Sequence, residues 1–485
     1  MSVFGVLLAM LMFLSATAQE SDFPADFLTK AFYKERRQKL REKLPANSVA
    51  IFFANPTRNR ANDVDYIYHQ DPDFYYLTGY KEANSVLLVF KDSQRSANGT
   101  SYDEIIFVQP RNPQAELWTG RRLGDSGVRD KLGLDQAFNN SEFKRYTVDF
   151  SKFASVLFFD FQNDVRNSPR DSSDLFDLIA QFKVKVHYPE KNNPTLALEP
   201  QKNNLDMTGL KPVMESLRGI KTAEELALIR RAVRISCAGQ AEVMKAIKPG
   251  MSEREIEGIH EYVFKKYQAE DMGYPSIVGA GHNGCILHYI DNYKPSISNR
   301  ELILMDLGAE FHGYTADITR TIPVNGKFSP EQKLIYELVL RAQEEAMKIC
   351  RPGTPFRELT AGTRNVINHG LKELGIIQNE SDKHSYYPHG CCHHIGLDVH
   401  DRGPYEKLEE NMVITIEPGI YIPDNAACDK KWWGIAVRIE DDYLVTKEGN
   451  EHLSVSAPRT VKDIEAMMKL PSALDDFVLP DLDKN

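Results

Sequence analysis

The sequence predicts an α/β domain followed by an α+β domain that is built from two similar halves. A chain of 485 residues is too long for one ordinary core and should divide into about two or three domains. The first 200 or so residues alternate short β-branched runs with amphipathic stretches. Beyond them, pairs of capped helices precede runs of strands, and this order occurs twice.

Composition and charge exclude several classes of protein. Hydrophobic residues make up 42% of the chain and charged residues 26%, which is typical of a folded globular protein and not of a disordered or fibrous one. Asp and Glu number 69 against 59 Lys and Arg, so the formal net charge is −10. Because binding to phosphates requires a basic face, we expect no nucleic-acid partner.

Residues 1–18 have the features of a secretory signal peptide. Val3–Leu14 is apolar apart from Gly5 and too short to span a bilayer, and the string Ala16-Thr-Ala18 matches a small-residue cleavage site. We therefore expect an exported protein, periplasmic or secreted, with no membrane association after cleavage. The segment lacks the usual Lys or Arg, so the alternative is an uncleaved lipophilic anchor. The six cysteines are too few and too scattered for a disulfide framework.

Residues 20–204 form the first predicted domain, of mixed α/β type. Amphipathic stretches near 26–43 and 172–182 predict helices. The segment Pro189–Asp206 is rich in Asn, Pro and Lys and predicts a linker. The runs that predict strands are rich in β-branched and aromatic residues: Val49–Phe53, Ser85–Phe90, Ile105–Val108, Val156–Phe161 and Val184–Tyr188.

Residues 205–466 form the second predicted domain, followed by a C-terminal tail at 467–485. Thr222-Ala-Glu-Glu225 is a capping box, in which a hydroxyl and a carboxylate pair with each other's free backbone N–H groups. Further helices are predicted after Ser252 and Ser329.

A short motif recurs about a hundred residues apart in this second domain. Each copy has a basic residue, Pro-Gly, three further residues, then Arg-Glu and an aliphatic residue, and each precedes a run of predicted strands. The copies are Lys248–Ile256 and Arg351–Leu359. The repeat indicates an internal duplication with a cleft where the two halves meet.

Two aspartates lie within an apolar, alternating stretch, Leu302–Val324. It reads as two strands, with Glu310–Gly313 as the turn between them. Asp306 and Asp317 are symmetric about the centre of that turn, so antiparallel pairing places them opposite each other. Opposed like charges are destabilising unless a cation lies between them. The alternative is that one aspartate belongs to the turn and the other caps another segment.

Histidines and glutamates farther along the chain have the character of metal ligands. Five of the 13 histidines lie between residues 384 and 400, and His389 and His393 are four residues apart, although this spacing alone does not specify a metal. Glu417 and Glu440 each end an apolar, strand-like run. A buried, unpaired carboxylate is costly, and a bound metal ion would relieve that cost.

The strings that contain these residues resemble the pita-bread metallopeptidases, specifically the aminopeptidase P family. In the first domain, Asn62–Tyr66, Asp73–Gly79 and Glu116–Gly124 resemble the family's creatinase-like domain. The resemblance implies an α/β N-terminal domain and an α+β pita-bread catalytic domain with an internal pseudo-duplication. The matching strings of the second domain are Asn283-Gly-Cys-Ile-Leu-His288-Tyr, Met305-Asp-Leu-Gly308, Ala316-Asp-Ile-Thr-Arg-Thr321, His389-x-x-x-His393, Gly396-Leu-Asp-Val-His400-Asp, Ile416-Glu-Pro-Gly-Ile-Tyr421 and Val437-Arg-Ile-Glu440-Asp-Asp.

The resemblance implies a site for two divalent metal ions. Four carboxylates carry a charge of −4, which two divalent ions neutralise, and a set of oxygen donors with one imidazole suits Mn²⁺. Two ions about 3.5–4 Å apart lower the pKa of a shared water, so that a hydroxide nucleophile exists at neutral pH. The implied ligands are Asp306, Asp317, His393, Glu417 and Glu440.

The resemblance also implies a reaction and a role for the neighbouring side chains. A metal-bridged hydroxide attacks the carbonyl before a proline nitrogen, so the expected enzyme is an Xaa-Pro aminopeptidase acting on peptides with proline at position two. Glu417 would also accept the proton of the water. His288 and His400 would bind substrate and stabilise the oxyanion or the leaving group. His389 would line the proline pocket, and Arg438 would orient the groups around the ligands.

Other readings of the same residues stay open. A prolidase-like dipeptidase could use this site, because loops decide substrate length. A binding module without enzymatic activity is a further alternative, because some proteins use this fold only for binding. Such modules lose metal ligands, whereas this sequence keeps all five ligand residues. The family resemblance also implies a homodimer or homotetramer. Cys391 and Cys392 replace the small residues expected between two site histidines, so we expect sensitivity to thiol-reactive agents or to excess Zn²⁺.

Overall fold

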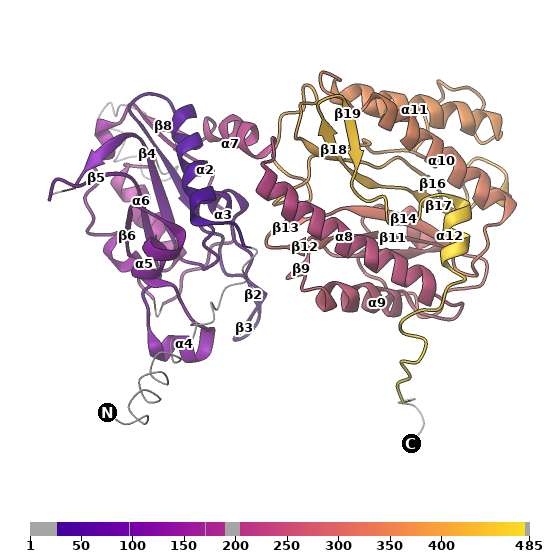
Figure 1. Cartoon of the computed structure of the whole chain (residues 1–485), viewed down its shortest axis with the longest axis horizontal. Coiled ribbons are helices and arrows are strands. Elements are labelled where there is room, and N and C mark those ends of the chain that lie inside the picture. The colour runs from indigo at the N-terminus through magenta and orange to yellow at the C-terminus, as the bar shows by residue number, and fades with distance from the viewer. Residues whose placement is uncertain (1–26, 97, 170, 190–203, 481–485) are drawn as a thin grey trace, which may run out of the picture.

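The first domain is built on one six-stranded sheet, which lies beside the second domain in Figure 1. The computed structural model describes residues 27–96, 98–169, 171–189 and 204–480. The strand order is β6-β5-β4-β1-β7-β8, with β1 antiparallel to β4 and parallel to β7. The strands are β1 (Ser48–Phe53), β4 (Val86–Arg95), β5 (Ser101–Val108), β6 (Gln136–Asn139), β7 (Ser155–Phe158) and β8 (Leu205–Asp206).

This sheet is buried on both faces, because alternate residues of a strand point to opposite sides. Ala50 and Phe52 of β1 join the main core that continues into the second domain, whereas Val49 and Ile51 face a separate core on the other side. A small hairpin, β2 (Asn59–Ala61) and β3 (Val64–Asp65), lies apart from the sheet. The α-helices of the domain are α2 (Lys30–Lys43), α3 (Pro72–Thr78), α4 (Pro113–Thr119), α5 (Gly124–Gly127) and α6 (Leu175–Lys185). It also has a short π-helix, η1 (Val128–Leu132), and two short 3-10 helices, η2 (Asn140–Glu142) and η3 (Phe150–Lys152).

The strand predicted at Val184–Tyr188 is wrong. Helix α6, capped by Asp174, continues to Lys185 and covers the first half of that run. The apolar residues that precede the run have helical spacing, and their burial carries the helix into the start of the run. Strand β8 follows the linker and pairs in parallel with β7, so the first sheet extends two residues beyond 204. Most of the predicted linker, residues 190–203, lies outside the described residues.

The second domain has six helices and eleven strands in the described part of the chain. The capping box predicted at Thr222 is confirmed, and the helices predicted after Ser252 and Ser329 also begin with capping boxes. The helices are α7 (Leu210–Arg218), α8 (Ala223–Ala246), α9 (Glu253–Lys266), α10 (Pro330–Ile349), α11 (Phe356–Glu373) and α12 (Val461–Met467), with short turns at η5 (Gly281–Cys285) and η6 (Lys430–Trp432). The strands are β9 (Asp271–Met272), β10 (Ile277–Ala280), β11 (Leu302–Leu307), β12 (Ala309–Phe311), β13 (Tyr314–Thr315), β14 (Ile318–Pro323), β15 (Val413–Ile416), β16 (Gly419–Ile422), β17 (Ile435–Arg438), β18 (Asp441–Thr446) and β19 (Gly449–His452).

The internal duplication is confirmed by the order of these elements. A packed helix pair precedes strands in each half: α8 and α9 before β9–β14, then α10 and α11 before β15–β19. Figure 1 shows the two helix pairs on different sides of the strands. The halves meet where β14 lies beside β17. Across this seam the Thr321 hydroxyl donates to the Arg438 carbonyl (3.1 Å), and the Glu440 N–H donates to the Thr319 carbonyl (3.1 Å).

Of the two end segments predicted from the sequence, the structure describes only residues 467–480 of the C-terminal tail. The predicted signal peptide, residues 1–18, lies outside the described residues. Within the predicted C-terminal tail, Ser472 donates to Glu242 of α8 (2.6 Å), and Asp475 pairs with Lys248 (3.1 Å). Among the described helices, none combines the length and the apolar composition needed to cross a bilayer.

Candidate metal centre

All nine residues that the sequence predicts for the site line one cavity of about 340 Å³. They come from both halves of the second domain, so the cavity lies where the halves meet. Leu287, Gly390 and Cys392 complete its wall. The predicted site residues in the wall are His288, Asp306, Asp317, His389, His393, His400, Glu417, Arg438 and Glu440.

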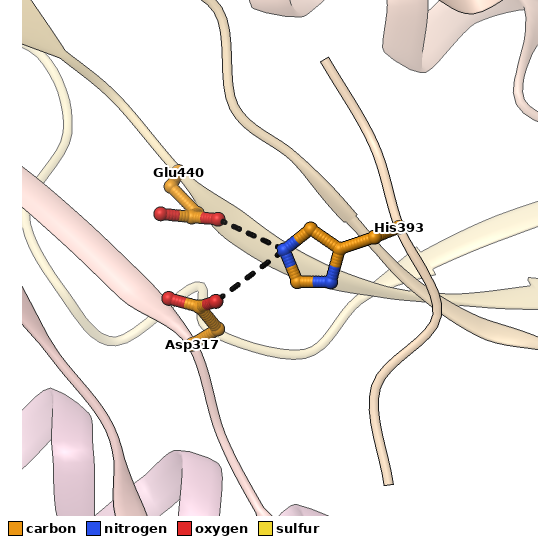
Figure 2. A group of neighbouring side chains, drawn as sticks. All are labelled: Asp317, His393 and Glu440. Atoms are coloured by element: carbon orange, nitrogen blue, oxygen red, sulfur yellow. Dashed lines mark ion pairs between the residues drawn. The ribbon is translucent and has the colours of Figure 1, made fainter. Parts of the chain in front are cut away.

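Three of the predicted metal ligands form the tightest group (Figure 2). Donor atoms of Asp317, His393 and Glu440 all lie within 4.8 Å of one another. His393 Nε2 is 3.5 Å from Asp317 Oδ2 and 3.9 Å from Glu440 Oε1. It is also 3.5 Å from Glu417 Oε1. The structure therefore brings carboxylates from both halves of the domain to one nitrogen of a single imidazole.

The Asp306–Asp317 pairing differs from the predicted register. Asp306 of β11 pairs with Thr319 of β14, while Asp317 lies just before β14 begins. The prediction was wrong by two residues because the turn consists of His312 and Gly313, both with positive φ (52° and 86°), and not of residues 310–313. A shift of two residues keeps a side chain on the same face of a strand. Both carboxylates therefore still face the cavity.

Tyr274 was not predicted as a site residue, yet it bridges these two aspartates. Its hydroxyl lies 2.6 Å from Asp306 Oδ1 and 2.7 Å from Asp317 Oδ1. Thr319 is a second unpredicted neighbour, and it donates to Glu440 (2.6 Å). Tyr274 lies in none of the motif strings, and Thr319 lies within the string Ala316–Thr321 without a predicted role of its own. Only the folding of their segments against the ligands identifies them.

Two further groups hold the predicted ligands in place. Arg438 Nη2 donates to Asp306 Oδ2 (2.6 Å), and Arg438 Nη1 donates to the Tyr421 hydroxyl (3.0 Å). The N–H of Asp317 donates to Asp442 Oδ2 (3.1 Å). Asp442 Oδ1 is buried and has no hydrogen-bond partner within the described part of the chain. The buried carboxylate oxygens of this cluster therefore outnumber the hydrogen-bond donors that the protein offers them.

The electrostatics of the cavity show the same imbalance. Burial, followed by repulsion between neighbouring carboxylates, raises the pKa of Asp317, Glu417 and Glu440 well above the usual range. Burial would also raise the pKa of Asp306, but the Arg438 guanidinium and the Tyr274 hydroxyl outweigh it and hold that pKa below its usual value. Four acidic groups thus face one fixed cation. Divalent cations are the complement that such a set of donors lacks.

The three predicted catalytic histidines differ in how they are held. The His389 ring bonds to the Gly390 carbonyl (2.6 Å) and the Tyr421 hydroxyl (2.8 Å), and burial, then nearby Arg438, lowers its pKa to about 4. The His400 ring packs edge-on against His393, with centroids 4.5 Å apart. His288 is exposed at the cavity wall.

The other two histidines of the cluster lie outside the cavity wall. His394 is fully buried, with Nε2 at 2.9 Å from the Pro404 carbonyl. His384 Nε2 is 3.0 Å from Asn368 Oδ1. The clustering of five histidines therefore reflects two local roles, three residues at the cavity and two in packing.

Comparison with known proteins shows the family to which this chain is similar. The family model described as "Metallopeptidase family M24" matches residues 227–447, and the model described as "Aminopeptidase P, N-terminal domain" matches residues 33–157. The Xaa-Pro aminopeptidase of Escherichia coli is 35% identical over 91% of this chain and 98% of its own length. The corresponding enzyme of Haemophilus influenzae is 36% identical with the same coverage, and human Xaa-Pro aminopeptidase 3 is 31% identical over 90% and 86%.

Solved structures lead to the same class of protein. Aminopeptidase P from Escherichia coli with the inhibitor Pro-Leu superposes with a TM-score of 0.78 at 33% identity, covering 91% of this chain and 98% of that one. The aminopeptidase PepP of Pseudomonas aeruginosa gives a TM-score of 0.78 at 35% identity with the same coverage. The fold is that of an M24 metallopeptidase. Within that class, the chain belongs to the aminopeptidase P family, which confirms the predicted pita-bread domain and its creatinase-like partner.

Proposed function

We propose that this chain is a dinuclear metal-dependent Xaa-Pro aminopeptidase, which removes the first residue from peptides that carry proline at position two. The observation that carries the proposal is the convergence of four carboxylates and one imidazole, from both halves of the domain, on a single cavity. The bacterial relatives are Xaa-Pro aminopeptidases, which supports the substrate class, and the likeness extends over nearly all of their length.

The residues present fit two divalent ions, and Mn²⁺ suits a set of mainly oxygen donors. Asp306, Asp317, His393, Glu417 and Glu440 would hold them. When bound, such ions lower the pKa of a water molecule and polarise the scissile carbonyl. The excess of buried acceptors around Asp442 and the raised carboxyl pKa values support this assignment.

The remaining side chains act on the substrate and on protons. Glu417 borders the cavity with its Oε1 3.5 Å from His393 Nε2, where a carboxylate can accept a proton. His400 and His288 lie on the wall where they can donate to the oxygen or nitrogen of the scissile bond. His389 is neutral and fixed by Tyr421, which suits the wall of a proline pocket. The nitrogen of an Xaa-Pro bond carries no hydrogen, so the enzyme cannot recognise this bond through the backbone hydrogen bonds that pair β-strands. The shape of the pocket must recognise the proline ring instead.

The test combines metal analysis with peptide cleavage. Purified protein should contain about two divalent ions per chain and should release the first residue of an Xaa-Pro-Yaa tripeptide. Removal of the ions by a chelator should abolish cleavage, and Mn²⁺ should restore it better than Zn²⁺. Cleavage that persists in metal-free protein would contradict the proposal, and so would a protein that contains no stoichiometric metal.

A prolidase-like dipeptidase is the alternative on the same site. Xaa-Pro dipeptides assayed beside tripeptides and longer peptides distinguish the two activities. The proposed enzyme cleaves tripeptides and longer peptides, whereas cleavage confined to dipeptides would reverse the assignment.

We also propose that the protein is exported and forms a homodimer or homotetramer. The apolar run Val3–Leu14 and the string Ala16-Thr-Ala18 support export. Family resemblance supports assembly. N-terminal sequencing of the mature protein should begin at residue 19, and light scattering on the purified protein measures its mass. An N-terminus at residue 1 would contradict cleavage, and a monomer at micromolar concentration would contradict assembly.

A further inference from the structure

The loop that carries His400 is fastened to the first domain by a buried cation. Arg218, at the end of α7, is 1% exposed. It donates to Asp73 of α3 in the first domain (2.7 Å) and to Asp398 (2.9 Å), and it contacts Asp401. Asp398 and Asp401 stand on either side of His400 in the sequence. One guanidinium therefore joins the first domain to both flanks of a predicted catalytic residue.

Two more cations complete this network. Lys221, which is also buried, donates to Asp401 Oδ2 (2.6 Å). Arg402 pairs with the second oxygen of Asp73, Oδ2 (2.9 Å). Three acidic and three basic side chains thus balance one another. Because buried charges are costly when unpaired, removal of one partner forces the others to rearrange.

The loop itself has little freedom to absorb such a change. A Cβ on Gly396 would lie 2.1 Å from Asp401 Oδ2, and one on Gly403 would lie 2.5 Å from the His394 ring. The Gly396 carbonyl accepts from the Thr315 N–H (2.8 Å). Tight packing on both sides means that a shift of the Asp401 carboxylate moves the backbone of the loop.

The position of the His400 ring depends on that backbone. Within the part of the chain that the structure describes, no hydrogen bond holds the His400 ring, whose contact is the edge-on packing against His393. The His389 ring differs, since a carbonyl and a hydroxyl hold it from both sides. The fixed loop therefore positions the His400 ring, whereas hydrogen bonds position the His389 ring.

We propose that Asp73 and Arg218 are positioning residues for His400, so that the first domain takes part in the chemistry of the second. This inference rests on the proposed function and deepens it. Asp73 touches neither the cavity nor the predicted ligands; it acts through Arg218 and the loop. A displacement of about 1 Å at a catalytic group lowers turnover by up to about a hundredfold.

The substitution Asp73→Asn tests the inference, because it removes the charge and keeps the shape. On an Xaa-Pro-Yaa tripeptide, kcat/KM should fall by about 10–100-fold while the metal content of the protein stays unchanged. The same substitution in a His400→Ala background should change kcat/KM by less than about twofold, since the residue through which it acts is already absent.

A matched control separates this role from a loss of stability. Glu104→Gln breaks the buried Arg37–Glu104 pair (3.1 Å), which lies wholly in the first domain. It should lower the melting temperature and leave kcat/KM within about twofold of the wild type. If Asp73→Asn does not fold, Arg402→Gln replaces it, because the Arg402 side chain is 33% exposed and its loss is better tolerated.

The outcomes are distinct. Equal losses from Asp73→Asn in the wild-type and His400→Ala backgrounds would overturn the inference, and so would an unchanged kcat/KM or a loss of metal. A wild-type protein that cleaves no proline-second peptide would instead overturn the proposed function.

Discussion

At the scale of single residues, two adjacent thiols distinguish this metal cavity. All six cysteines are free thiols. Cys392 lines the cavity next to His393, whereas Cys391 is fully buried and accepts from the Thr360 hydroxyl (3.6 Å). A reagent that enters the cavity therefore meets Cys392 and not its neighbour.

Alkylation of Cys392 should block the enzyme, because an added group occupies part of a cavity of about 340 Å³. Treatment with iodoacetamide should lower kcat/KM by at least about tenfold through displacement of substrate. The variant Cys392→Ser should retain activity and resist the reagent, while Cys391→Ser should stay sensitive. Equal inactivation of wild type and Cys392→Ser, followed by peptide-mass assignment, would contradict this prediction.

At the scale of elements, the hairpin β12–β13 determines where Asp317 falls. Its two-residue turn places His312 and Gly313 at positive φ, which sets the β11–β14 register on either side of it. Gly313 also lies where a Cβ would be 2.9 Å from the Tyr75 ring and 3.3 Å from Leu397. The turn therefore requires glycine for its backbone conformation and for its close contact with the first domain.

Substitution of this glycine should destabilise the fold. Gly313→Ala combines a strained φ with the contact against Tyr75 and should lower the free energy of unfolding by about 1–3 kcal/mol. Urea denaturation measures the change. Gly258→Ala is the control, because Gly258 lies in α9 with open space around its Cβ position and should gain about 0.5–1 kcal/mol. An unchanged midpoint for Gly313→Ala would show that the turn is not under this constraint.

At the scale of the whole molecule, metal binding and folding are linked through the acidic ligands. Burial and mutual repulsion raise the pKa of Asp317, Glu417 and Glu440 in the metal-free fold. A carboxyl group whose pKa is higher in the folded than in the unfolded protein stabilises the fold at pH values below the unfolded pKa. This stabilisation is lost as the pH rises through the folded pKa. The metal-free protein therefore loses stability from these groups as pH rises above about 4.

Bound metal should remove that loss, because it favours the charged carboxylates. The rise in melting temperature on adding Mn²⁺ should therefore increase from about pH 5.5 to about pH 8. Differential scanning fluorimetry of metal-free and metal-loaded protein measures the difference. Buried histidines away from the site, such as His260 with a pKa lowered to about 3 by burial, affect both forms and cancel. A metal-dependent rise that is the same at every pH would contradict the prediction.

Interactions between residues close in the sequence made many helices and several site residues predictable. The capping boxes at Thr222 and Ser252 satisfy backbone groups within four residues, so their helices were predicted where the structure has them. Glu417 and Glu440 were recognisable because each follows an apolar strand, where a carboxylate needs a partner. The run at Val184–Tyr188 was misread, since five residues are too few for their pattern to distinguish the end of a helix from a strand.

Contacts between distant segments set the remaining features. The sequence by itself determined which residues carry the charge of the metal cavity, because residue type and local pattern decide where a carboxylate is out of place. Only the tertiary structure decided that Tyr274 bridges two of the ligands and that Asp73 reaches the His400 loop through Arg218. These interactions join residues 32 to 183 positions apart in the chain, and their energies depend on packing geometry that no local pattern encodes.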